Sequence, residues 1–359
     1  MLDKRHYVPI LKWKQGEQTA LNLLPKFIKE SITPLIELPP IEWNYEKEQP
    51  KKTIDKHLNG IGDSIDKHWG KQQAFFIDLL YIKENDRLQN GEHPLQFVLG
   101  DLRQKKVVGI PITSVERDVA FQTEIIEANR IDNLGVGIRV REEDFGDLKT
   151  KIDHLLAILN IAKCSIDLIV DFEYIDPNTN IRTTLFLKEF LNNIPYLNDW
   201  RNIIFCATSF PKDLSEVQRD SIEVIPRSEW IIWKDLIKTE NIIRKPVFGD
   251  YTIANPSPFE ADPRVIKIPA SIRYTGDDQF VVFKGKNLRK FGYEQYYDLA
   301  AQLVDHEEYK GPTFSAGDQY AYVVASKSDK PGSPTTWRRA GTNHHIVQVA
   351  TELSNLLLP

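Results

Sequence analysis

Hydrophobic positions recur along roughly the first 250 residues as short, continuously apolar runs, most of them followed by a segment with helical periodicity. A continuous apolar run of this length indicates a strand that is buried on both faces. Strands that alternate with helices are typical of a parallel sheet covered by helices. The runs cover residues 7–13, 32–38, 74–81, 107–114, 134–141, 166–175, 202–210 and 245–252.

Seven or eight such units in roughly 250 residues match the size and repeat count of a (β/α)8 barrel. The alternative is a doubly wound open sheet, which usually has fewer units and a glycine-rich turn after its first strand. Here that turn reads "KWKQGEQ" and holds a single glycine. We therefore predict an α/β fold of the (β/α)8, TIM-like type.

The alternation stops after residue 252, where "NPSPFEADP" is typical of a connector. Residues 270–286 are predicted to form a hairpin with Gly276 and Asp277 in its turn. A helix over 293–309 and a strand over 318–326 complete an α+β segment inserted before the last helix.

The last helix is predicted to start near residue 343, with Thr342 or Asn343 as its N-cap, and to complete the barrel. The predicted domains are a barrel formed by residues 1–252 and 337–359 and an inserted hairpin, helix and strand over 253–336. The eighth barrel strand is 245–252 or, alternatively, 270–275.

Polar residues near the ends of the predicted strands are the first candidates for a site, since functional groups of these barrels gather at the carboxyl ends of the strands. Asp78 and Asp171 lie among apolar neighbours, and Glu37 is similar. A buried carboxylate needs a partner or a polar cavity. Arg139 or Lys12 would provide an ion pair, and a functional site is the alternative. Glu116, Arg117 and Arg141 are expected in solvated loops.

A second concentration of charge is "TTWRRAGTNHHI" at residues 335–346. If the last helix starts here, its free N–H groups would lie at the same face as the strand ends. Together with the helix dipole and the arginines Arg338 and Arg339 they would form an anion site, near His344. The alternative is an N-cap, a solvated arginine pair and one histidine packed on the core.

Composition narrows the functional classes. The 359 residues include 46 lysines and arginines against 51 aspartates and glutamates, so the formal net charge is −5 and a generally basic surface is excluded. A local cationic cleft remains compatible with that charge. Two cysteines exclude a disulfide framework, and the sequence holds no P-loop, dinucleotide fingerprint, GxSxG elbow or HExxH motif. With no signal peptide or membrane-spanning run, a cytoplasmic location is expected.

The segments "HYVPILKWKQGEQTAL", "IVDFEYI", "YKGPTFSAGDQY" and "WRRAGTNHHI" resemble the Protein beta family, and the likeness extends from Tyr7 to the last helix. The resemblance implies a context of phages, prophages and defence loci, and a companion protein encoded nearby. It implies no established activity and no catalytic residues.

Three functions are compatible with these features. In the first, the strand-end face binds a phosphate-bearing ligand, either a nucleotide or a nucleic acid. In the second, Glu37, Asp78 and Asp250 bind magnesium in a metal-dependent phosphodiesterase or nuclease. In the third, a non-enzymatic module binds a partner protein through exposed aromatic residues of 273–283 and 292–299. The first assigns anion binding to Lys12, Lys14, Arg139, Arg338 and His344, and any catalysis to Asp78, Asp171 and Glu37.

Overall fold

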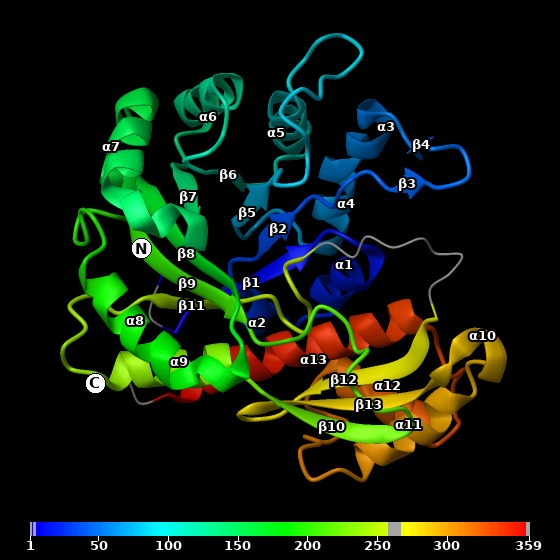
Figure 1. The fold of residues 1–359 in the computed structure, drawn as a ribbon. Helices are drawn as coiled ribbons and strands as arrows, with labels where there is room; N and C mark the ends of the chain where they lie inside the picture. The colour runs from blue at the N-terminus through cyan, green and yellow to red at the C-terminus, as the bar shows by residue number, and fades with distance from the viewer. Residues whose placement is uncertain (1, 3–4, 258–266, 357–359) are drawn as a thin grey trace.

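The structure, a computed structural model, describes residues 2, 5–257 and 267–356. Eight parallel strands close into a barrel in the order β1-β11-β9-β8-β7-β6-β5-β2 (Figure 1). The predicted (β/α)8 class is therefore confirmed. The barrel strands are β1 (Tyr7–Lys12), β2 (Leu35–Glu37), β5 (Phe75–Asp78), β6 (Gly109–Thr113), β7 (Val136–Arg141), β8 (Ile166–Tyr174), β9 (Asn202–Thr208) and β11 (Val247–Asp250).

The barrel closes between its first and last strands. β11 pairs in parallel with β1, where Val8 lies opposite Gly249, and with β9, where Phe248 lies opposite Phe205. The eighth strand therefore comes from residues 245–252. The alternative, 270–275, forms part of a separate sheet.

Helices follow the strands and cover the barrel with apolar residues at helical spacing. In α6, for example, the Asp118 side chain accepts hydrogen bonds from the first free N–H groups, and Phe121, Ile125 and Ala128 form the buried face. The barrel helices are α1 (Gln15–Asn22), α2 (Lys26–Glu30), α3 (Ile54–Leu58), α4 (Ile61–His68), α5 (Pro94–Lys105), α6 (Val119–Asp132), α7 (Leu148–Leu159), α8 (Asn180–Asn192), α9 (Ser228–Lys238) and α13 (Pro334–Asn355). A short hairpin, β3 (Trp43–Asn44) and β4 (Gln49–Pro50), follows β2.

A second, antiparallel sheet lies beside the barrel in the order β10-β13-β12. The predicted hairpin forms β12 (Pro269–Thr275) and β13 (Gln279–Asn287), with Gly276 and Asp277 in the turn. Its third strand, β10 (Ser221–Pro226), comes from the segment before α9, outside the predicted insertion. The division into two domains stays a prediction, and residues 258–266 of its connector lie outside the described residues.

Two elements near the C-terminal end differ from the prediction. Residues 318–326 were expected as a strand, but α12 (Ala316–Ala325) is a helix whose buried residues Gly317, Asp318, Ala321 and Val324 recur at helical spacing. The last helix begins at Pro334 with Ser333 as its N-cap, so Thr342 and Asn343 lie inside it. Across the part of the chain that the structure describes, neither this 22-residue helix nor any other is long and apolar enough to cross a bilayer.

The aromatic residues of the insertion mostly form its core. Tyr274, Phe280, Phe283 and Tyr296 are at most 3% exposed, whereas Tyr293 is 46% exposed. They pack between the sheet and the helices α10 (Leu288–Phe291), α11 (Gln295–Val304) and α12, or against the barrel side. The partner-binding hypothesis needed these rings at the surface, so burial removes most of the surface on which it depended.

Helix α13 joins the two sheets, lying between the barrel and β12 (Figure 1). Its His345 contacts Asp250 of the barrel at 2.9 Å through Nε2 and the Thr275 hydroxyl of β12 at 2.8 Å through Nδ1. Burial lowers the pKa of His345 despite the neighbouring Asp250 carboxylate. The last helix therefore fixes the inserted sheet relative to the barrel.

Candidate functional site

A layer of charged side chains closes the barrel interior at the carboxyl ends of the strands. Side chains alternate between the two faces of a strand, so a residue two positions after an interior one also points inward. Leu35, Phe76 and Ile169 belong to the apolar interior, and the next inward positions are Glu37, Asp78 and Asp171. Arg139 lies on β7 in the same layer.

Arg139 connects all three carboxylates. Its Nη1 donates to Glu37 Oε1 and to Asp78 Oδ2, both at 2.8 Å. Its Nε and Nη2 lie 2.9 and 2.7 Å from Asp171 Oδ2. Nη2 also donates to the Tyr251 hydroxyl, which donates to Asp171 at 2.5 Å. Of the two predicted ion-pair partners, Arg139 and not Lys12 therefore binds the carboxylates. Because Arg139 uses its N–H groups in these contacts, it does not take part in an anion site.

Burial sets the charge balance of this cluster. Each of the four charged side chains is at most 3% exposed. Burial would lower the pKa of Arg139, but Tyr251, Asp171, Glu37 and Asp78 raise it well above the usual value. Burial and the nearby Asp78 raise the pKa of Glu37, whose Oε2 has no hydrogen-bond partner among the described residues.

Arg117 is the second cation of this cluster. Its Nη2 lies 3.4 Å from Asp78 Oδ1, and its side chain is 16% exposed, so the expected solvated loop is wrong for this residue. The layer therefore holds two arginines beside three acidic side chains.

A strap formed by residues 253–257 runs past the end of β1. Lys12 Nζ donates to three of its carbonyl oxygens, at 3.1 Å to Asn255, 2.7 Å to Pro256 and 3.3 Å to Ser257. The Tyr81 hydroxyl donates to Pro256 as well. Trp13 points the other way and packs in the core between strands and helices. Lys12 therefore uses its three N–H groups to hold the strap.

Replacing Lys12 with methionine should loosen the strap, because charged hydrogen bonds of this kind contribute about 1.5–3 kcal/mol. We expect the Ala254 and Ser257 amides to exchange with solvent about tenfold faster or more, as measured by hydrogen exchange. Burial lowers the pKa of Lys12 to about 8. The same loosening should therefore develop in the unchanged protein between pH 7 and 9, beyond the intrinsic rise of exchange with pH.

Lys14→Met is the matched control, because Lys14 is an exposed lysine two residues further along the chain. Equal exchange in the Lys12 and Lys14 variants would contradict this role of Lys12.

A large cavity lies between the barrel and the inserted sheet, with a volume of about 2540 Å³. It is lined by the start of α1, the β3–β4 hairpin, the strap, the loop before β10 and parts of β12, β13 and α13. Its described lining residues include 14 lysines and arginines against 5 aspartates and glutamates. In a chain whose net charge is −5, this is a strong local excess of cations.

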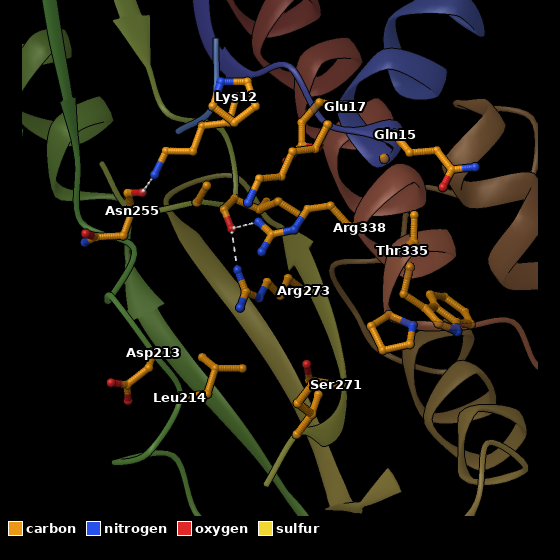
Figure 2. A pocket seen from close by; sticks show the side chains of 18 of the residues that line it. Lys12, Gln15, Glu17, Asp213, Leu214, Asn255, Ser271, Arg273, Thr335 and Arg338 are labelled. Carbon is orange, nitrogen blue, oxygen red and sulfur yellow. Dashed lines mark hydrogen bonds between the residues drawn. The ribbon is translucent and has the colours of Figure 1, made fainter. Parts of the chain in front are cut away.

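Two arginines meet inside this cavity. Arg273 of β12 and Arg338 of α13 both donate to the carbonyl oxygen of Ile253, at 2.8 and 2.9 Å (Figure 2). Among the described residues, neither guanidinium forms an ion pair with a carboxylate. Burial, and the charge of Arg338, lower the pKa of Arg273 well below its usual value, and burial lowers that of Arg338. These two cations face each other with little compensation.

Helix α1 presents its N-terminus to the same space. Its N-cap residue Lys14 makes no side-chain capping bond, and Lys14, Gln15, Gly16 and Glu17 line the cavity. A Cβ on Gly16 would lie 3.0 Å from Arg338 Cγ, so glycine allows the arginine to lie against the helix. Glu17 is the nearby acid, and burial raises its pKa. Free N–H groups and the helix dipole thus add to the positive potential.

The predicted site residues divide into two groups. Lys12, Lys14 and Arg338 line the cavity, whereas Glu37, Asp78, Arg139 and Asp171 form the buried cluster and are absent from its lining. His344 belongs to neither, because it lies inside α13, where its ring nitrogens contact Asp318 and the Thr275 carbonyl at 2.8 Å. The prediction that it marks the helix start is wrong.

The ligand set proposed for magnesium is not brought together. Asp250 faces the outer helices, accepts a hydrogen bond from the Tyr7 hydroxyl and contacts His345, so it lies apart from Glu37 and Asp78. Within the described residues, no group of three or more His, Cys, Asp or Glu side chains is arranged to hold a metal ion. The residues present therefore do not fit the predicted metal site.

Sequence reasoning missed Arg273. It lies in the middle of the predicted hairpin, where an arginine among alternating residues is expected at the solvated face. The signal that could have found it is the alternation itself, since Ile272 and Tyr274 point to the core and Arg273 to the opposite face. That this face meets the barrel instead of water follows from the placement of the sheet.

Comparison with known proteins gives a family and distant structural likenesses. The crystal structure of triosephosphate isomerase from Bartonella henselae is 9% identical, with a TM-score of 0.35, over 68% of this chain and 91% of that chain. The barrel assignment rests on the strand pairing described above. No curated protein sequence matches the chain. A family model described as Beta protein matches residues 7–351, so the chain belongs to the Beta protein family.

Proposed function

We propose that the cavity between the barrel and the inserted sheet binds a phosphate-bearing ligand, a nucleotide or a nucleic acid. The observation that carries the proposal is the pair Arg273 and Arg338, two half-buried guanidiniums that share one carbonyl oxygen and form no ion pair among the described residues. Guanidinium groups bind phosphate oxygens bidentately, and an anion between them would offset their repulsion.

The residues of the proposed binding site differ from those predicted from the sequence. Arg273, Arg338 and the uncapped start of α1 contact the anion, Lys14 adds charge at the rim, and Lys12 holds the strap that supplies the Ile253 carbonyl. Arg139 and His344 are not included. The buried carboxylates support the barrel beneath and are assigned no catalytic step.

The test measures thermal unfolding of the full chain with inorganic tripolyphosphate. A ligand that binds the native state at a hundred times its Kd adds about 2.7 kcal/mol of apparent stability. We expect the unchanged protein to be stabilised and the variant Arg273→Gln/Arg338→Gln to lose this effect. Glutamine keeps a polar amide and removes the repulsion between the two charges, so the ligand-free variant should be about as stable as the unchanged protein.

The matched control replaces two exposed arginines of the outer helices, Arg130 and Arg182, with glutamine. This control should keep the full response, and added salt should weaken it, because screening reduces the attraction. The proposal is wrong if the cavity variant and the control respond alike.

The setting of phages and defence loci that the family resemblance implies stays a prediction, as do the companion protein and the cytoplasmic location. Binding of a phosphate-bearing ligand agrees with that setting without depending on it.

A further inference from the structure

Exposed aromatic side chains lie at the rim of the same cavity. Trp43 is 45% exposed and Tyr45 is 36% exposed, and both line it from the β3–β4 hairpin. Trp43 lies in β3 and Tyr45 begins the turn that follows it, so the two rings lie two residues apart on the hairpin. Neither ring stacks on another ring or on a cation among the described residues. Their faces are therefore open to a planar ligand.

The hairpin that carries these rings is held in shape by its own polar groups. Asn44 Oδ1 accepts hydrogen bonds from the N–H groups of Glu46 and Lys47, which fixes the turn. Lys51 and Glu42 form an ion pair of 2.7 Å across its base. The rings are thus presented on an ordered projection, which limits the entropy that binding would cost.

Cations continue from the rings into the cavity and onto the far wall. Lys51 and Lys52 lie on the hairpin, Arg273 and Arg338 lie deeper, and Lys286 and Lys290 lie on the sheet side. The ammonium groups of Lys286 and Lys290 lie 5.5 and 5.3 Å from the centroid of the Phe291 ring. The volume of about 2540 Å³ exceeds the roughly 300–1,000 Å³ of small-molecule pockets. A ligand longer than a mononucleotide fits this distribution.

We infer that the phosphate-bearing ligand is a single-stranded nucleic acid, whose bases stack on Trp43 and Tyr45 while its backbone passes over Arg273 and Arg338. The inference rests on the proposed function and adds the substrate class. A cationic groove with aromatic stacking platforms is the arrangement that binds single strands without reading their sequence. A duplex keeps its base faces stacked inside, so its bases cannot stack on the two rings.

The test uses fluorescence anisotropy of labelled oligothymidine and oligouridine of about ten nucleotides, within the site sizes known for single-strand binders. A blunt duplex of equal length and unlabelled tripolyphosphate serve as competitors. Stacking contributes about 1–3 kcal/mol per base, so Trp43→Ala/Tyr45→Ala should weaken single-strand binding about tenfold or more. Tripolyphosphate has no bases, and its affinity should not change.

The matched control is Phe27→Ala/Tyr322→Ala, which removes two exposed aromatic rings outside the cavity, 67% and 47% exposed. It should bind both probes as the unchanged protein does. Binding of the DNA probe, the RNA probe or both supports the inference, and their ratio identifies the preferred backbone.

The two proposals fail in different ways. If tripolyphosphate binds through Arg273 and Arg338 but the duplex binds as tightly as the single strand, or the Trp43/Tyr45 variant binds normally, the single-strand inference is overturned and the anion site stands. If neither tripolyphosphate nor any oligonucleotide binds, both are overturned.

Discussion

Replacement of Arg139 with methionine is expected to lower the free energy of unfolding by roughly 3–5 kcal/mol at pH 7, the usual cost of leaving buried charges without their partner. The variant would keep Glu37, Asp78 and Asp171 within one barrel layer with the cation at their centre removed. Urea unfolding of the full chain measures the loss.

Arg141→Met is the matched control, because Arg141 lies two residues further along the same strand but pairs with Glu173 at 3.7 Å in a partly exposed position. Exposed pairs of this kind contribute about 0–1 kcal/mol. Similar losses for the two variants would contradict the central place of Arg139.

The pH dependence of the Arg139 variant provides a second signature. Burial raises the pKa of Glu37 and Arg139 lowers it, so removal of the arginine should raise this pKa further above its value in the unfolded chain, and the folded state then binds more protons in that range. Stability then falls as pH rises, and the deficit of the variant should shrink between pH 7 and 5. A deficit that is constant with pH would indicate a packing defect instead of uncompensated charge.

Gly317→Ala is expected to cost roughly 2–3 kcal/mol, because α12 and α13 approach each other at this glycine. A Cβ there would lie 2.1 Å from the carbonyl oxygen of Ala340, which belongs to the backbone and cannot rotate away. The Gly317 N–H also donates to Asn343 Oδ1 across the two helices.

The matched control for this substitution is Gly100→Ala in α5, where a Cβ would meet nothing within 4 Å. Alanine is favoured over glycine in a helix by about 0.5–1 kcal/mol, so this variant should gain stability. Chemical unfolding of both variants checks that the first loses stability and the second gains it. If Gly317→Ala leaves the free energy of unfolding unchanged, the two helices separate at little cost.

The barrel and its charged layer could be predicted because their signals are local. Continuous apolar runs reveal strands, and Asp78 and Asp171 stand out because each interrupts such a run. The choice between Arg139 and Lys12 as their partner depends on where long side chains end in space. Lys12 lies beside Glu37 in the sheet register, yet its amine turns to the strap.

The errors near the C-terminal end have physical reasons. Residues 318–326 are rich in tyrosine and valine, which favour strands, but the buried face of α12 recurs every three or four residues and tertiary packing selects the helix. The start of α13 carried a usable signal in Ser333 followed by Pro334, an N-cap and first helical residue. The pairing of β10 with β13 joins residues far apart in sequence and had no local signal.

The position of α13 has a consequence for synthesis of the protein. It lies C-terminal to every other described element, yet it packs on α1 and β1 near the other end of the chain, where the Asn343 side chain donates to Ala20. Translation proceeds from the N-terminus, so the apolar surfaces of α1 and β12 stay uncovered until this helix has been made. The nascent chain should therefore depend on chaperones until translation of α13 is complete.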